Sequence, residues 1–434
     1  MSEYMSPEEI LKKYDEYLLP AVMKYHKSPI HLVKGEMQYV YDHAGKKYLD
    51  AFGAVVTISV GHCHPDVVSA VKKQVETLQH VTTLYLTEPV VNLAEKFAQI
   101  TPGELCKSFF TNSGTEANEV AALLCKNYTK RHEFIGLRHS FHGRTLMSMT
   151  LTGQSIWRHS VPYVFGVSHA PSAYCYRCPY GMTYPSCDIG CAREIEEIIK
   201  YSTSGTIAGF IAEPIQGFGG VIDPPKEYFK IAVDIVHKYG GLFISDEVQT
   251  GFGRTGDKWF GIEQWDVVPD LITVAKGFGN GVPIGGVITT AKIAESMRGV
   301  THFSTYGGNP VSCVQAKAVI DTIEKQNYAN NSKVVGDYIK EQLFALQEKH
   351  SIIGDVRGKG LMLGIELVKD RKTKEPASAE LLRMMDLCKD EGVLIGKGGM
   401  TGNVIRIKPP MCITKDDADT IIKVLDKSFE QLKK

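Results

Sequence analysis

The sequence lacks any long apolar run and any excess of charge of one sign. No apolar stretch in its 434 residues approaches the roughly 18 residues that a membrane-spanning helix needs. Lys+Arg and Asp+Glu number 49 each, so no strong field attracts nucleic acid or an anionic membrane. The first ten residues show neither the apolar core of a secretion signal nor an Arg-rich transit pattern. These absences predict a cytoplasmic protein that binds neither nucleic acid nor membranes.

What is present is the composition of an ordinary globular protein, with 43% hydrophobic and 23% charged residues. The length allows one large and one small domain. Strand and helix patterns alternate through most of the chain, and a mixed set of strands and helices follows near the C-terminus. This order predicts an α/β fold, with a large domain over residues 55–325 and a small α+β domain that residues 1–54 and 326–434 form together.

Lys276 stands where an apolar strand pattern, Leu271–Val274, runs into three glycines at 277, 279 and 281. Burial at such a strand end would lower the pKa of the amine and leave a nucleophile. An amine of this kind forms a Schiff base with an aldehyde, and the commonest aldehyde cofactor is pyridoxal 5'-phosphate (PLP). The alternative is a lysine that extends from the strand end into solvent.

Asp246 ends another apolar strand pattern, Leu242–Ser245, and precedes Lys276 by 30 residues. That separation is about one strand–crossover–strand unit. Both side chains would then lie at the carboxyl ends of parallel strands, where open α/β sheets bind ligands. A carboxylate in that place can keep the pyridine nitrogen of PLP protonated. A helix cap is the alternative role for Asp246.

Two further segments offer groups that would suit the rest of such a cofactor. Ser113-Gly-Thr-Glu116 fits a capping box after a strand pattern, and the helix start around Gly114 and Thr115 can attract a phosphate. Phe141, followed by His142, could stack on a flat pyridine ring. The alternatives are that Ser113–Glu116 only caps a helix, and that Phe141 is a core residue beside a hydrogen-bonded His142.

Arg406 lies in a strand-like segment, Val404–Ile407, far along the chain from Glu213, which follows the apolar run Thr206–Ala212. The planar fork of an arginine suits the carboxylate of an amino acid or a 2-oxo acid. A surface salt bridge between the two residues is the alternative.

Four cysteines, Cys175, Cys178, Cys187 and Cys191, have the spacing C-x2-C-x8-C-x3-C. In a chain without a secretion signal, this pattern is closer to a metal site than to a disulfide framework. Four thiolates could hold a structural zinc ion. A disulfide or redox pair, and reduced cysteines that only pack, are the alternatives.

Six motifs follow one another along the chain: Asn112-Ser-Gly-Thr-Glu-Ala-Asn118, Ser140-Phe-His-Gly-Arg144, Ala212-Glu-Pro-Ile-Gln216, Asp246-Glu-Val-Gln-Thr-Gly-Phe-Gly-Arg254, Ala275-Lys-Gly277 and Thr305-Tyr-Gly-Gly-Asn-Pro310. In this order they resemble the class III (ω-amino) aminotransferases. Segments 53–65 and 354–362 resemble the alanine–glyoxylate aminotransferase 2-like group within that class. The resemblance implies fold type I of the PLP-dependent transferases, with a mostly parallel central sheet in the large domain.

The resemblance also implies a role for each candidate residue. Lys276 holds PLP as a Schiff base, Asp246 pairs with the ring nitrogen, and Gln249 bonds the phenolic oxygen. The other cofactor contacts are Ser113, Gly114, Thr115, Phe141, His142 and, from the neighbouring subunit, Thr305. The protein would therefore be a homodimer, or a larger oligomer, with its active sites at the interface. In the substrate site Glu213 pairs with Arg406 when no α-carboxylate is bound, and Val55 and Tyr85 line the donor pocket.

The implied reaction moves an amino group from an amino acid or ω-amino acid (alanine, β-alanine or γ-aminobutyrate) to pyruvate, glyoxylate or 2-oxoglutarate. A PLP-dependent lyase of the amino-phosphate phospholyase or dialkylglycine decarboxylase type shares these motifs and is the alternative. The cysteine cluster would also suit a zinc-stabilised binding or scaffold protein.

Overall fold

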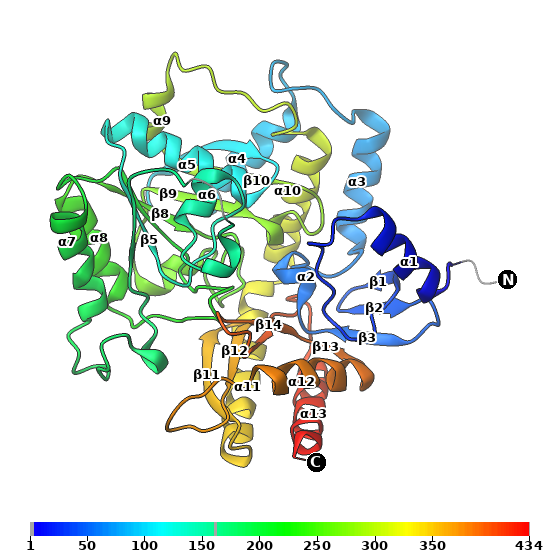
Figure 1. Ribbon diagram of the computed structural model, residues 1–434. Helices are drawn as coiled ribbons and strands as arrows, with labels where there is room; N and C mark the ends of the chain where they lie inside the picture. Colours follow the sequence, from blue (N-terminus) through cyan, green and yellow to red (C-terminus); the bar gives the residue numbers. More distant parts are fainter. Residues whose placement is uncertain (1–3, 160–162, 434) are drawn as a thin grey trace.

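The computed structural model describes residues 4–159 and 163–433, and its largest sheet has seven strands in the order β4-β10-β9-β8-β7-β5-β6 (Figure 1). The strands are β4 (Leu105–Thr111), β5 (Phe134–Leu137), β6 (Val167–Ala170), β7 (Gly209–Ala212), β8 (Leu242–Asp246), β9 (Leu271–Ala275) and β10 (Gly285–Thr290). Of the seven, β10 runs antiparallel to both of its neighbours, and the pairs from β9 to β6 are parallel. The predicted α/β fold with a mostly parallel sheet is confirmed.

Helices bury both faces of this sheet, so successive residues of a strand enter different cores. Phe243 of β8 packs in one core and Ile244 in the other. The first core contains side chains of α3 (Pro65–Thr77), α4 (Glu88–Ile100), α7 (Gly190–Ser202), α8 (Tyr228–Lys238) and α10 (Pro310–Lys325). The second contains side chains of α5 (Gly114–Thr129), α6 (Leu146–Leu151) and α9 (Ala291–Ala294). Burial on both faces explains why these strands read as continuous apolar runs.

Two four-stranded sheets lie beside the large one, in the orders β1-β2-β3-β13 and β11-β12-β15-β14. Their strands are β1 (Leu32–Glu36), β2 (Tyr39–Asp42), β3 (Lys47–Asp50), β11 (Ile353–Lys359), β12 (Met362–Leu367), β13 (Val393–Leu394), β14 (Gly396–Gly398) and β15 (Val404–Ile407). Helices α1 (Pro7–Tyr17), α11 (Tyr328–Lys349), α12 (Ser378–Asp390) and α13 (Lys415–Leu432) accompany them (Figure 1). All these strands fall before residue 55 or after residue 325. The exact limits of the two domains stay a prediction.

None of the helices in the described part of the chain combines the length and the apolarity needed to cross a bilayer.

A left-handed turn, α2 (Gly53–Val56), follows β3 and precedes α3. Its four residues have φ of 58°, 48°, 63° and 68°. Left-handed backbone costs roughly 1–2 kcal/mol for each L-residue, and β-branched valines rarely adopt it. One carboxylate oxygen of Asp50 compensates in part, because it accepts the N–H groups of Phe52 (3.0 Å) and Gly53 (2.8 Å). The sequence shows this segment only as small and apolar, so the turn was not predicted.

Ala54→Gly should raise the free energy of unfolding by up to about 1 kcal/mol, because glycine adopts φ near +50° without a Cβ penalty. Ala98→Gly, on the exposed side of α4, is the matched control and should lower stability by about 0.5–1 kcal/mol. Thermal and urea unfolding of both variants measure the difference. Equal destabilisation by the two changes would show that residue 54 is not left-handed.

Candidate active site

The carboxyl ends of β8 and β9 and the start of α5 meet at a cavity of about 250 Å³. Asp246 ends β8, Lys276 follows β9 directly, and Ser113 is the N-cap of α5. Because Asp246 pairs in register with Thr273 of β9, the two strand ends lie side by side. The predicted residues that line the cavity are Ser113, Gly114, Thr115, Phe141, His142, Asp246 and Lys276.

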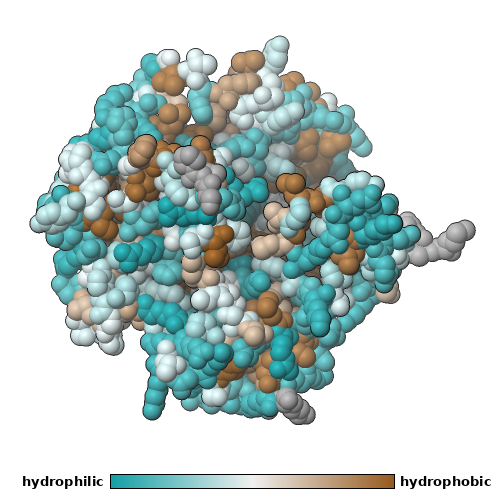
Figure 2. Space-filling model, in the orientation of Figure 1, coloured by the Kyte–Doolittle hydropathy of each residue, from teal (hydrophilic) through white to brown (hydrophobic). Residues whose placement is uncertain are grey.

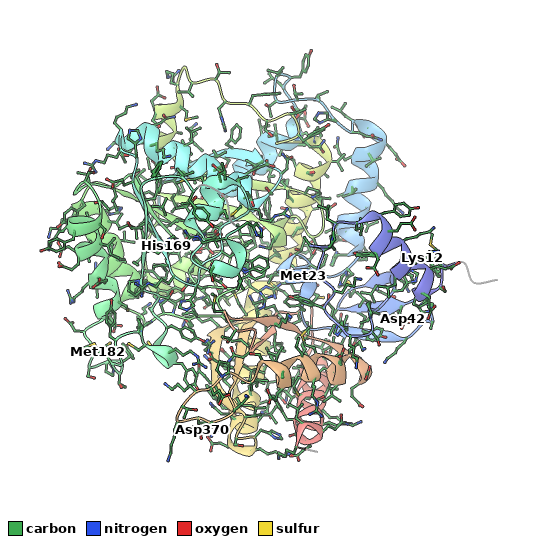
Figure 3. The ribbon with its side chains drawn as sticks, in the orientation of Figure 1. Lys12, Met23, Asp42, His169, Met182 and Asp370 are labelled. Carbon is green, nitrogen blue, oxygen red and sulfur yellow. The ribbon has the colours of Figure 1, made fainter. Side chains whose placement is uncertain are left out.

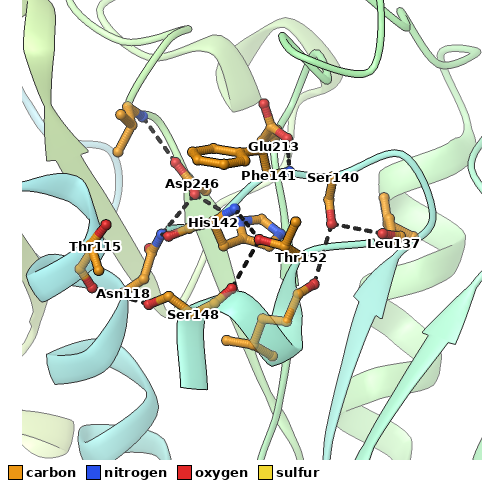
Figure 4. A network of polar contacts seen from close by, with 12 residues as sticks. Thr115, Asn118, Leu137, Ser140, Phe141, His142, Ser148, Thr152, Glu213 and Asp246 are labelled. Carbon is orange, nitrogen blue, oxygen red and sulfur yellow. Dashed lines mark hydrogen bonds and ion pairs between the residues drawn. The ribbon is translucent and has the colours of Figure 1, made fainter. Parts of the chain in front are cut away.

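Three donors hold the buried carboxylate of Asp246 (Figure 4). Its Oδ2 lies 2.8 Å from His142 Nδ1 and accepts a hydrogen bond from Asn118 Nδ2 at 2.9 Å. Its Oδ1 accepts the N–H of Val248 at 3.2 Å. The carboxylate is therefore fixed in orientation, and Oδ1 keeps a lone pair for a further donor. Asn118 was not predicted as a site residue, although it ends the first of the six motifs.

Lys276 is half-buried at the cavity wall, and no hydrogen bond to its Nζ is recorded within the described ranges. Loss of solvation lowers its pKa; Asp246 and Glu213 act in the opposite direction, and Arg406 adds to the lowering. A lowered pKa makes the neutral, nucleophilic amine more accessible. The backbone of Lys276 has φ of 50°, a conformation in which strained residues often mark functional sites.

The start of α5 offers unpaired backbone donors to the same cavity. Ser113 Oγ accepts the N–H of Glu116 at 3.2 Å, as a capping box requires. The Glu116 carboxylate, however, accepts the backbone and side-chain N–H groups of Asn112, both at 2.9 Å, instead of the Ser113 N–H. For Gly114 and Thr115 no N–H partner is recorded in the described chain. These free donors at a helix start fit the phosphate of a cofactor.

Glu213 is buried between the backbone groups of two neighbouring loops. Its carboxylate accepts the N–H of Phe141 at 3.0 Å and the N–H of Gly217 at 2.8 Å (Figure 4 shows the contact to Phe141). Burial raises its pKa. Glu213 thereby ties the Phe141 segment to the turn at Gly217.

Arg406 of β15 is fully buried, with its guanidinium 4.9 Å from the ring centre of Phe52 and 4.7 Å from that of Phe218. Its Nη2 lies 3.5 Å from the Tyr25 hydroxyl, while Nε and Nη1 have no partner among the described residues. No ion pair joins Arg406 to Glu213 within 4.0 Å. Burying two donor nitrogens without hydrogen-bond partners costs free energy unless a ligand accepts from them. A carboxylate matches the planar geometry of the guanidinium group.

The remaining candidates do not line the cavity of this chain. Gln249 is buried behind it, where its Oε1 accepts a hydrogen bond from Lys408 at 3.0 Å. Val55 is half-buried in the left-handed turn, and Tyr85 and Thr305 are exposed, the first between α3 and α4 and the second before α10.

Cys175, Cys178 and Cys187 lie in the segment between β6 and α7, which Met182 marks in Figure 3, and Cys191 lies in the first turn of α7. All four are free thiols. Burial, with neighbouring thiols, raises the pKa of Cys175 and raises that of Cys191 to about 12. Among the described His, Cys, Asp and Glu side chains, the one group of three within 4.8 Å is His350, Asp426 and Glu430, so these sulfurs do not form such a group. The zinc site stays a prediction.

The family described as Aminotransferase class-III matches residues 21–429, nearly the whole chain. The chain is a class III aminotransferase. Among curated relatives, it is 48% identical over 427 residues to alanine–glyoxylate aminotransferase 2 homolog 2, mitochondrial, of Arabidopsis thaliana (98% of this chain, 88% of the relative). It is 38% identical over 433 residues to a leucine/methionine racemase of Thermococcus litoralis (98% and 96%).

Solved structures of similar proteins cover almost all of this aminotransferase. A Bacillus anthracis aminotransferase has a TM-score of 0.93 at 33% identity and covers 99% of this chain and 100% of its own. An amine transaminase from an uncultivated Pseudomonas species, solved in a PLP-bound form, has a TM-score of 0.89 at 30% identity (96% and 98%). The predicted resemblance to class III aminotransferases, and to the alanine–glyoxylate aminotransferase 2-like group, is confirmed.

Gly217→Ala should disturb the aminotransferase's site, because a Cβ at 217 would overlap the terminal atoms of the Gln249 amide and displace them. We expect reduced amino transfer with a loss of no more than about 1 kcal/mol in the free energy of unfolding, because the end of a flexible side chain can move aside. Gly190→Ala is the control, since no atom lies within 4 Å of its added Cβ. If both variants matched the parent in unfolding and activity, the packing of Gln249 against Gly217 would be wrong.

Proposed function

We propose that this chain is a PLP-dependent aminotransferase that moves an amino group from an amino acid or ω-amino acid to pyruvate, glyoxylate or 2-oxoglutarate. The observation that carries the proposal is one cavity that joins the amine of Lys276, the carboxylate of Asp246 and the free N–H groups of α5. The cofactor is pyridoxal 5'-phosphate, which supplies an electron sink for the carbon next to the substrate amine.

The chain's own groups match the parts of that cofactor. Lys276 would hold its aldehyde carbon covalently, and Asp246 Oδ1 would face the ring nitrogen. The free N–H groups of Gly114 and Thr115, with the Ser113 cap, would hold the phosphate. Phe141, which packs 4.8 Å from Phe218, would cover one face of the ring, and Gln249 would donate to the phenolic oxygen.

Lys276 Nζ would carry the proton from Cα of the donor to the aldehyde carbon of the bound cofactor, and would carry one back to Cα of the new amino acid in the second half of the reaction. Burial lowers the pKa of this amine, which favours the neutral form that such a base needs. Asp246 keeps the ring nitrogen protonated, while His142 and Asn118 hold the carboxylate in place. Arg406 binds the carboxylate of the amino acid or oxo acid with the nitrogens that have no partner in the described chain. Because the backbone groups of two loops occupy Glu213, it acts by positioning Phe141.

Two loops at the top of Figure 1 support a homodimer with shared active sites. Leu84, Tyr85 and Leu86 expose apolar side chains on one loop, and Phe303 and Tyr306 on the other. Asn309 joins the loops, since its Nδ2 donates to the Gln79 carbonyl at 3.1 Å. Figure 2 shows hydrophobic residues gathered in this upper region, as expected of a surface that a partner covers. Thr305 would reach the partner's phosphate from here, and Tyr85, with Val55, would complete the donor pocket.

Amino-acid racemisation is a second candidate, which the racemase among the curated relatives favours. Both reactions remove a proton from Cα, and a racemase returns it to either face. A screen of L-alanine, β-alanine, γ-aminobutyrate, L-leucine, L-methionine, an amino-phosphate (phosphoethanolamine) and a dialkylglycine (2-aminoisobutyrate) against pyruvate, glyoxylate and 2-oxoglutarate separates them, with chiral analysis of alanine, leucine and methionine. Amino transfer without D-isomer supports the proposal, D-isomer formed without an oxo acid supports the racemase, and release of phosphate or carbon dioxide supports the lyase.

Lys276→Ala should abolish amino transfer and the label that borohydride fixes when PLP is present, because it removes the covalent link and the base. Lys230→Ala, an exposed lysine on α8, is the control and should match the parent. Mass spectrometry locates the label and a coupled assay follows the transfer. Full activity in Lys276→Ala would refute the assignment.

Arg406→Lys should lower kcat/KM for alanine by about 10- to 100-fold, because hydrogen bonds between charged partners contribute roughly 1.5–3 kcal/mol. The change should leave kcat/KM for 1-phenylethylamine, a donor without a carboxylate, almost unaltered. Steady-state kinetics with both donors measure the split. An equal fall for the two donors would mean that Arg406 supports the fold and not the carboxylate.

A further inference from the structure

Strand β15 brings a second cation to the active site besides Arg406. Lys408 follows the strand by one residue and lies two residues beyond Arg406, so both side chains project from the same face. Lys408 has 0% of its surface exposed, and its backbone N–H donates to the Ala51 carbonyl at 2.8 Å. It was not predicted as a site residue, although the spacing of two in Arg406-Ile-Lys408 would have indicated a shared face.

The Lys408 amine has one recorded hydrogen bond, to Gln249 Oε1 at 3.0 Å. No carboxylate lies within 4.0 Å of it in the parts of the chain that the structure describes. Burial lowers its pKa well below the usual value; Arg406, Lys276 and Arg254 lower it further, and Glu213 opposes them. Burial without a counter-ion disfavours the ammonium form of a lysine, and the neutral amine still donates hydrogen bonds.

Gln249 is buried, with 5% of its surface exposed. Its side-chain amide lies against Gly217, where an added Cβ would overlap it. With Oε1 bound to Lys408, the Nε2 group points away from Lys408 and has no recorded partner within the described ranges. The amide is therefore held with its donor side available.

We propose that Lys408 is a positioning residue of the active site, which fixes the side-chain amide of Gln249 so that Nε2 can donate to an anionic oxygen of the bound cofactor. This proposal rests on the proposed function, because it needs PLP in the cavity. Lysine suits the position because it donates without adding a permanent charge beside Arg406 and Arg254, as an arginine would. Lys408 itself makes no contact with substrate.

A double-mutant cycle of Lys408→Met and Gln249→Met tests the proposal. Each single variant should weaken binding of PLP to the cofactor-free protein about tenfold, as measured by tryptophan fluorescence. Each should also shift the pH midpoint of the bound cofactor's absorbance in the same direction. The double variant should be no weaker than either single one, because both changes remove the same contact.

Two further variants separate positioning from a structural role. Lys408→Gln keeps a donor for Gln249 Oε1 and should retain most of the affinity and the pH midpoint of the parent, which also keeps the test open if Lys408→Met does not fold. Ile407→Val, on the opposite face of β15, should lower the melting temperature of the cofactor-free protein without shifting the midpoint.

Additive losses in the cycle, or a Lys408→Met variant that is less stable but has unchanged affinity and midpoint, would overturn the role of Lys408. Those outcomes leave the proposed function intact if the parent still transfers amino groups and Lys276→Ala does not. A parent protein that binds no PLP would overturn both proposals.

Discussion

The removal of water from a few charged groups is the constraint on which the active site depends. Lys276, Arg406 and Lys408 are all shifted toward their neutral forms by burial, and the buried carboxylate of Glu213 is shifted toward its protonated form. Such groups remain in a fold only where hydrogen bonds or a ligand compensate for lost solvation. Asp246 has its three donors within the protein, whereas Arg406 keeps two unpaired nitrogens. Asp246, whose hydrogen bonds are made within the protein, therefore helps to hold the site together. Arg406, whose two nitrogens lack partners, is available to a ligand.

The protein meets this constraint by building the site from two of its sheets. The seven-stranded sheet contributes Asp246 and Lys276 at the carboxyl ends of neighbouring parallel strands. The four-stranded sheet β11-β12-β15-β14 contributes Arg406 from β15 and Lys408 directly after it. Gln249 connects the two sets, because it follows β8 closely and bonds to Lys408. The left-handed turn at Gly53–Val56 reaches the same region, since a Cβ on Gly53 would lie 2.9 Å from the Lys408 carbonyl.

Much of this arrangement could be predicted from the sequence, because strands buried on both faces leave continuous apolar runs. Those runs located β8 and β9, and with them Asp246 and Lys276. Asn118 and Lys408 were missed because their importance depends on contacts with residues more than a hundred positions away. The left-handed turn was missed because valine favours strands, and only tertiary contacts stabilise it there. The domain limits, the cytoplasmic location and the zinc site remain predictions, since no contact described above depends on them.

The place of Arg406 between Phe52 and Phe218 has a consequence for substrate choice. One ring precedes the left-handed turn and the other follows the Glu213 segment, so the guanidinium is clamped by two separate parts of the chain. If Arg406 binds the substrate carboxylate as proposed, its separation from Lys276 would set the distance between that carboxylate and the carbon that loses its proton. Substitutions that tilt β15 relative to β9 would change the distance between Arg406 and Lys276 without altering any reacting group. Relatives with the same chemical groups could in this way come to prefer donors of different length.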